Sequence, residues 1–100
     1  MDTVIGSFAD KGTAEVFNGI ESAAARRTCP KSLWSVARRK LDQLNRARDL
    51  GDLTVPPGNR LELLKGKRAG QHSIRINVRY RICFRWEKDY AEKVEITDYH

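Results

Sequence analysis

The last three positions of the chain hold a carboxylate, a phenol and an imidazole: Asp98, Tyr99 and His100. Side chains of these types can donate, accept or orient a proton near neutral pH. Val94 and Ile96, just before them, alternate with other residues and predict a strand that would hold this C-terminal group at the edge of a sheet. The alternative is a frayed, solvated terminus.

Positive charge is concentrated between residues 60 and 88. This basic segment contains nine basic and two acidic residues, a net charge of +7, whereas the other 71 residues sum to −1. A polyanion is the natural partner of such a surface, because Lys and Arg displace counterions from phosphates. A solvated face is the plainer alternative, but interleaved aromatic residues favour nucleic acid. The basic residues are Arg60, Lys65, Lys67, Arg68, Arg75, Arg79, Arg81, Arg85 and Lys88.

Together, the C-terminal group and the basic segment fit the cleavage of RNA without a metal ion. A 2′-hydroxyl must lose a proton and attack the adjacent phosphorus, and the leaving 5′-oxygen must gain a proton. Cations must stabilise the charge that develops on the phosphorus. Lys65, Arg68 and Arg81 could hold the phosphate, and Tyr99 could stack a splayed base.

Other chemistries find little support. The two histidines and two cysteines lack the spacing of zinc ligands, and neither a P-loop nor a GxGxxG motif is present. We therefore expect no metal and no cofactor. Cys83 falls in the middle of a predicted strand and should be inert. Cys29 precedes the main predicted helix, where the helix dipole could lower its pKa.

The order of the elements predicts an α+β fold, with two N-terminal helices packed on a mostly antiparallel sheet of four to five strands. Alternation places Ile74, Ile76, Ile82 and Phe84 under the helices and a row of arginines, Arg75, Arg79, Arg81 and Arg85, on the open side. The expected elements are a strand at 4–8, a helix at 10–17 capped by Asp10, a main helix from near Pro30, a loop at 51–59, and strands at 61–64, 72–78, 79–86 and around 94–96.

Size and composition narrow the class of protein. The 100 residues, with a net charge of +6 and 40% hydrophobic residues, predict a single domain over 1–100. No apolar run is long enough to span a bilayer, and the first residues do not resemble a secretory signal. Two cysteines are too few for a disulfide framework. We therefore expect a cytoplasmic protein that does not bind membranes.

Four stretches give the chain a resemblance to the HigB-like toxins, which belong to the RelE superfamily of bacterial toxin–antitoxin systems. No single stretch is decisive, but the terminal Asp-Tyr-His after an aromatic-Arg-Ile-x-Phe strand is fairly specific. The stretches are Leu63-Leu64-Lys65-Gly66, Ser73-Ile74-Arg75-Ile76-Asn77, Tyr80-Arg81-Ile82-Cys83-Phe84-Arg85-Trp86 and Asp98-Tyr99-His100.

The resemblance implies a microbial-ribonuclease-like toxin that enters the A site of the 30S subunit and cleaves the bound mRNA. It also implies a HigA-like helix-turn-helix antitoxin, with operator DNA bound only through the complex. Carried over by position, Lys65 and Arg81 match residues that contact the scissile phosphate, and the C-terminal group matches the active site. Arg68 matches a basic residue of the same loop. Charge adds Lys67, Arg75, Arg79 and Arg85 as expected RNA-binding residues.

Two positions depart from some relatives. Glu62 stands where some carry a histidine, which leaves either Glu62 or His100 as the main acid or base. His72 stands where some carry an aromatic residue, a change that should be tolerated.

Two other functions remain open. A non-catalytic protein could stall translation by occupying RNA or the ribosome. A DNA-binding module is less favoured, because Asp42 and Asp49 interrupt the arginines of the main helix and no helix-turn-helix pattern precedes it.

Overall fold

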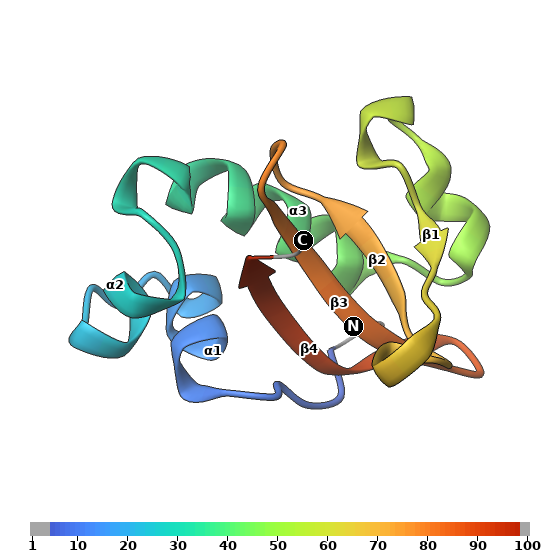
Figure 1. The fold of residues 1–100 in the computed structure, drawn as a ribbon, viewed down its shortest axis with the longest axis horizontal. Coiled ribbons are helices and arrows are strands. Elements are labelled where there is room, and N and C mark those ends of the chain that lie inside the picture. Colours follow the sequence, from blue (N-terminus) through green and yellow to red (C-terminus); the bar gives the residue numbers. More distant parts are fainter. Residues whose placement is uncertain (1–4, 99–100) are drawn as a thin grey trace.

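Helices cover one face of a four-stranded antiparallel sheet in the computed structural model, which describes residues 5–98 (Figure 1). The strands lie in the order β1-β2-β3-β4, and α3 lies behind them in the view, while α1 lies beside β4 and α2 beside α1. The helices are α1 (Lys11–Asn18), α2 (Ala23–Thr28) and α3 (Trp34–Arg46), and the strands are β1 (Glu62–Leu63), β2 (His72–Arg75), β3 (Tyr80–Glu87) and β4 (Tyr90–Asp98). Short 3-10 turns occupy Lys31–Leu33, Leu50–Thr54, Pro57–Asn59 and Gly66–Arg68.

Side-chain caps define the first two helices. The Asp10 carboxylate accepts a hydrogen bond of 2.7 Å from the backbone N–H of Thr13 and begins α1, as predicted. Gly19, at φ 74°, ends it in the left-handed conformation that glycine adopts without strain. Ser22 caps α2 in the same way as Asp10, through the backbone N–H of Ala25 at 3.0 Å. These caps satisfy donors that a helix start leaves unpaired.

The core forms between α3 and the sheet. Leu41 and Leu44 lie on the buried stripe of α3 and belong to one hydrophobic cluster with Ile74, Ile82 and Phe84 of the sheet. All five are almost fully buried, which confirms the predicted inward face of β2 and β3. Burial of each such side chain contributes roughly 1.5–3 kcal/mol to folding.

The outer edge of β4 is covered by the N-terminal part of the chain. The backbone N–H of Val94 donates to the Ser7 carbonyl at 3.1 Å, and the Val94 carbonyl accepts from Ala9 at 2.9 Å. Further along, the Ile96 N–H donates to the Thr13 hydroxyl at 3.0 Å. Because Thr13 is fully buried, this bond attaches α1 firmly to the end of β4, just before the C-terminal group.

Several predicted boundaries were wrong. The strand predicted at 4–8 does not form over residues 5–8, where a single parallel bridge joins Phe8 to Val94; residue 4 lies outside the described residues. The strand predicted at 72–78 ends at Arg75, because the Asn77 side chain accepts hydrogen bonds of 2.8 Å from the N–H groups of Arg79 and Tyr80 and turns the chain. The loop predicted at 51–59 contains two 3-10 turns, and α2 was not predicted.

No helix in the described part of the chain has both the length and the apolar character needed to cross a membrane.

Candidate active site

Arg81 of β3 is held by contacts from three groups. Its Nε donates to the Ser73 hydroxyl at 2.7 Å, and its Nη2 donates to the Arg60 carbonyl at 2.7 Å. The Glu62 carboxylate lies 3.4 Å from the same Nη2, so β1 and β2 together position the guanidinium. Only 11% of the Arg81 side chain is exposed. Such a fixed, partly desolvated fork stabilises an anion more strongly than a mobile surface cation does.

Arg68 approaches the same face of the sheet from the turn after β1. Its Nη1 lies 3.0 Å from the Glu95 carboxylate of β4 and 3.1 Å from the Gln71 side chain. Glu95 is the cross-strand partner of Cys83. Cys83 in turn lies two residues from Arg81 on β3. Arg68 and Arg81 therefore both lie near Cys83, and both charges act on its thiol.

This face is less open than the sequence predicted. Cys83 and Ser73, which lie on the same face as the arginines, are both fully buried. Burial raises the pKa of the Cys83 thiol, and the nearby charges of Arg68 and Arg81 only partly oppose it. Cys83 is therefore an inert packing residue, as predicted. The prediction of a row of guanidinium groups on the open side of the sheet is wrong for Arg81, whose side chain is only 11% exposed, and Arg68 contacts Glu95 of β4 on this face.

Cys29 is also inert. Burial raises the pKa of its thiol to about 11, so the lowering by a helix dipole that the sequence allowed does not occur.

The C-terminal group begins one residue beyond the cross-strand partner of Arg81. Thr97 pairs with Arg81, and Asp98 pairs with Tyr80. The Asp98 carboxylate lies 2.8 Å from the Arg79 guanidinium, and this hydrogen bond and charge raise the pKa of Arg79. Arg79 therefore contacts Asp98 at the end of the sheet, just outside β3. Tyr99 and His100 lie outside the described residues.

The other predicted RNA-binding residues are spread over the face. Lys65 and Lys67 are exposed, and neither side chain makes a hydrogen bond or ion pair with residues 5–98. The Arg75 guanidinium is turned aside, because its Nε donates to the Asn77 carbonyl at 3.0 Å. Arg85 packs closely on Gly70, where the Cβ of any larger residue would lie 3.0 Å from the Arg85 Nη1. Lys65, Lys67 and Arg68 thus share one turn, whereas Arg75 and Arg85 lie at opposite ends of the face.

His72 is a core-edge residue. Its ring stacks on Phe84 at a centroid distance of 6.1 Å, and burial lowers its pKa. Its Nδ1 is buried without a hydrogen-bond partner in the described structure. His72 is therefore neutral near pH 7, and its cross-strand partner Phe84 is four residues along β3 from Tyr80, the partner of Asp98. Among residues 5–98, no three His, Cys, Asp or Glu side chains come together as a metal site.

Two residues of this site were missed by sequence reasoning. Ser73 accepts the hydrogen bond of Arg81, and Glu95 holds Arg68. Their strand alternation was the available signal, since Ser73 and Arg75, like Glu95 and Thr97, are two residues apart on a strand. A serine or glutamate on a strand is usually solvated, however, and only the register shows that these two meet arginines.

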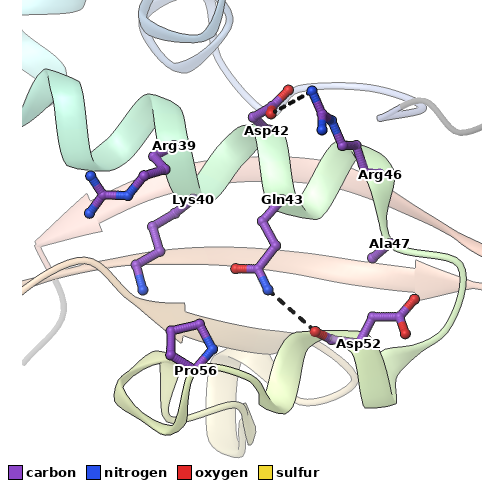
Figure 2. Close-up of a pocket in the computed structure, with 8 residues that line it drawn as sticks. All are labelled: Arg39, Lys40, Asp42, Gln43, Arg46, Ala47, Asp52 and Pro56. Carbon is purple, nitrogen blue, oxygen red and sulfur yellow. Dashed lines mark hydrogen bonds and ion pairs between the residues drawn. The ribbon is translucent and has the colours of Figure 1, made fainter.

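A separate hollow of about 560 Å³ lies between α3 and the 51–59 loop, with Gln43 and Lys40 extending toward the loop (Figure 2). Gln43 donates to the Val55 carbonyl at 2.6 Å and to the Asp52 carbonyl, while Lys40 donates to the side chain of buried Asn59. These bonds attach the loop to α3. The hollow therefore has a structural explanation, and it lies on the helical side of the sheet, away from Arg81.

Comparison with known proteins agrees with this geometry. Residues 6–100 match the family model of the HigB-like toxins, described as the RelE-like toxin of the type II toxin–antitoxin system HigB. Toxin HigB-1 of Vibrio cholerae is 39% identical over 79 residues, which cover 79% of this chain and 80% of that toxin. An uncharacterized protein of Haemophilus influenzae is 40% identical over 60 residues, 60% of this chain and 59% of that protein.

The fold has a solved counterpart as well. The YoeB–YefM complex from Staphylococcus aureus contains a chain that superposes with a TM-score of 0.58 at 16% identity, covering 96% of this chain and 97% of that one. This likeness concerns the fold, and it supports the α+β, RelE-like architecture that the sequence predicted. From the family match and the similarity to HigB-1, we conclude that the chain belongs to the HigB-like toxins, the RelE-like toxins of type II toxin–antitoxin systems.

Proposed function

We propose that this toxin is a ribosome-dependent endoribonuclease that cleaves mRNA in the A site without a metal ion. The supporting observation is the Arg81 guanidinium, fixed by Ser73, Glu62 and the Arg60 carbonyl and almost shielded from water, one strand away from the start of the C-terminal group. A guanidinium in this setting suits the negative charge of a pentacovalent phosphorus.

The proposed reaction is attack of a 2′-hydroxyl on the adjacent phosphorus. The 2′-oxygen loses its proton to a base, the bond from phosphorus to the 5′-oxygen breaks, and the 5′-oxygen takes up a proton from an acid. The products are a 2′,3′-cyclic phosphate and a 5′-hydroxyl. Arg81, assisted by Lys65 and Arg68, stabilises the phosphate. We assign the proton transfers to the C-terminal group because it matches the active site of the family.

The role of Glu62 in this reaction is to orient Arg81. Its carboxylate contacts the guanidinium at 3.4 Å and its side chain is 56% exposed. We assign the main proton transfer to His100, because the other histidine, His72, is neutral and packed on Phe84.

The partner that we propose is a HigA-like helix-turn-helix antitoxin, with operator DNA bound only by the complex. The family description and the solved YoeB–YefM complex, itself a two-protein assembly, support an antitoxin. Because the substrate is mRNA on ribosomes, the cytoplasm is the compartment in which this activity would operate.

The test uses purified ribosomes, a message and the toxin. We expect cleavage in the A site that proceeds in the presence of EDTA once ribosomes are stabilised by polyamines, and that stops when a 2′-deoxynucleotide replaces the nucleotide on the 5′ side of the cut. Cleavage of the 2′-deoxy message would rule out 2′-hydroxyl attack.

A second candidate is inhibition by occupancy alone. It is favoured by one observation, namely that no imidazole of residues 5–98 approaches Arg81. In that case ribosomes would stall on intact messages, and deletion of His100 would leave growth inhibition unchanged.

A further inference from the structure

A second hollow lies beside the end of β4, and the reaction described above gives it no role. Its volume is about 590 Å³, within the roughly 300–1,000 Å³ typical of small-molecule sites. It opens between the start of α1, the end of α2 and the adjoining ends of β3 and β4. The lining residues used below are Arg27, Tyr80, Thr97 and Asp98.

The position of this hollow relates it to the candidate active site. Thr97, in its lining, is the cross-strand partner of Arg81, and Asp98 is the first residue of the C-terminal group. The Cα atoms of cross-strand partners lie roughly 4.5–5.5 Å apart. An RNA strand whose scissile phosphate contacts Arg81 would therefore bring a neighbouring nucleotide to the end of β4, where the hollow begins.

The side chains of the hollow match the two parts of a nucleotide. Arg27, in the last turn of α2, is exposed, and its side chain makes no hydrogen bond or ion pair with the described residues. Tyr80 contributes a half-buried aromatic ring, which packs against the core and has the Arg79 guanidinium 5.9 Å from its centroid. A guanidinium binds phosphate through its planar fork, and an aromatic ring stacks an unpaired base.

Both carboxylates of the lining already have partners of their own. Asp10 caps α1 through the N–H of Thr13, and Asp98 pairs with Arg79 at 2.8 Å. Lys11, the other cation of the lining, is 79% exposed and lies 4.0 Å from Glu15, the outer limit of an ion pair. The cations at the mouth therefore remain available to a phosphate.

We propose that this hollow is a subsite for a ribonucleotide next to the cleaved bond, with Arg27 on a flanking phosphate and Tyr80 against the base. The inference rests on the proposed function, because it assumes that RNA is cut at Arg81. It extends the substrate-binding surface around the end of the sheet onto α2, outside the basic segment of residues 60–88.

The test compares Arg27→Gln with Arg26→Gln as a matched control. Arg26 is the preceding residue of α2, but it pairs with Glu21 at 3.5 Å and does not line the hollow. Single-turnover cleavage is measured at saturating toxin on ribosomes programmed with three messages. One is unmodified, and the others have an uncharged methylphosphonate in place of the phosphate immediately before or after the scissile one.

We expect Arg27→Gln to slow cleavage of the unmodified message by roughly fivefold to tenfold, while Arg26→Gln matches the wild type. On one of the two methylphosphonate messages, the wild type and Arg27→Gln should cleave at the same rate, because the charge that Arg27 contacts is gone.

Two results would overturn the subsite. In one, Arg27→Gln cleaves the unmodified message as fast as Arg26→Gln. In the other, its defect persists in full on both uncharged messages, which would place Arg27 against ribosomal RNA or another partner. Failure of the wild type to cleave the unmodified message would instead refute the proposed function, and the subsite with it.

Discussion

At the scale of single residues, the choice of arginine at position 81 follows from its surroundings. Its Nε and Nη2 contact three different groups, so the side chain is oriented before any substrate arrives. Lysine has the same charge, but it lacks the planar guanidinium that donates hydrogen bonds in two directions at once. In the proposed reaction, Arg81 therefore contributes preorganisation more than charge.

We predict that Arg81→Lys lowers the rate of mRNA cleavage by about 100-fold, the usual cost of losing one preorganised donor at a developing anion. The control is Arg46→Lys, an exposed residue of α3 that pairs with Asp42 at 3.3 Å. Rates come from single-turnover cleavage on programmed ribosomes, with thermal unfolding to show that both variants fold. Equal rates for the two variants would contradict the role of Arg81.

His72 gives a prediction about pH. In the unfolded chain it should protonate near the ordinary histidine pKa of 6.5, whereas burial lowers the pKa of the folded state. Between the two values the unfolded state binds more protons, so stability falls as the pH drops below about 6.5. We expect His72→Phe to reduce this loss of stability, measured by urea unfolding between about pH 7 and about pH 5.

The same experiment has an internal check. If His72→Phe showed the same pH dependence as the wild type, the neutral His72 stacked on Phe84 would not be the group responsible. Because phenylalanine can stack on Phe84 and has no unpaired nitrogen, the variant should also be at least as stable as the wild type near neutral pH.

At the scale of elements, β4 depends on α1 as well as on β3. Thr13 is fully buried and accepts the N–H of Ile96, two residues before Asp98. The position of the end of β4 is therefore set partly by a helix more than eighty residues earlier in the chain. A short helix with a single buried threonine does not reveal this contact in the sequence.

We predict that Thr13→Val, which keeps the shape of the side chain but removes the acceptor, lowers the free energy of unfolding by about 1–3 kcal/mol. Thr13→Ser retains a hydroxyl and should recover part of this loss. Urea unfolding measures both, and Thr28→Val serves as the control, since the Thr28 hydroxyl donates to a carbonyl of its own helix at 2.9 Å. A stable Thr13→Val protein would show that the bond to Ile96 contributes little.

The sequence was a good guide to elements with strong periodicity and a poor guide to contacts between them. The alternation of β2 and β3 and the cap of α1 were predictable, because each depends on neighbours in the chain. The partners of Arg68 and Arg81 were not, since Glu95 and Ser73 meet them only through strand register. The strand predicted at 4–8 does not form over residues 5–8, because these residues make one isolated bridge to β4 instead of a ladder.

At the scale of the whole molecule, the net charge of +6 favours encounter with RNA at long range. The exposed Lys65 and Lys67 turn extends this charge beyond the fixed guanidinium groups of the sheet. Diffuse cations of this kind contribute affinity that depends on salt, whereas the proposed function assigns the fixed, partly desolvated fork of Arg81 to the chemical step.

We predict that binding to programmed ribosomes weakens linearly in a plot of log affinity against log salt concentration. Lys67→Gln should reduce the slope by about one, because one phosphate contact is lost. Lys31→Gln is the control, because Lys31 pairs with Glu21 at 3.0 Å outside the basic segment. A slope unchanged by Lys67→Gln would exclude that residue from the RNA interface.

The central claim, that this toxin cuts the message, is tested most directly by mapping mRNA 5′ ends in bacterial cells after the toxin is induced. We predict new 5′-hydroxyl ends inside coding sequences for the wild type, and their loss in Arg81→Lys. Growth arrest with intact messages and no new ends inside coding sequences would contradict it.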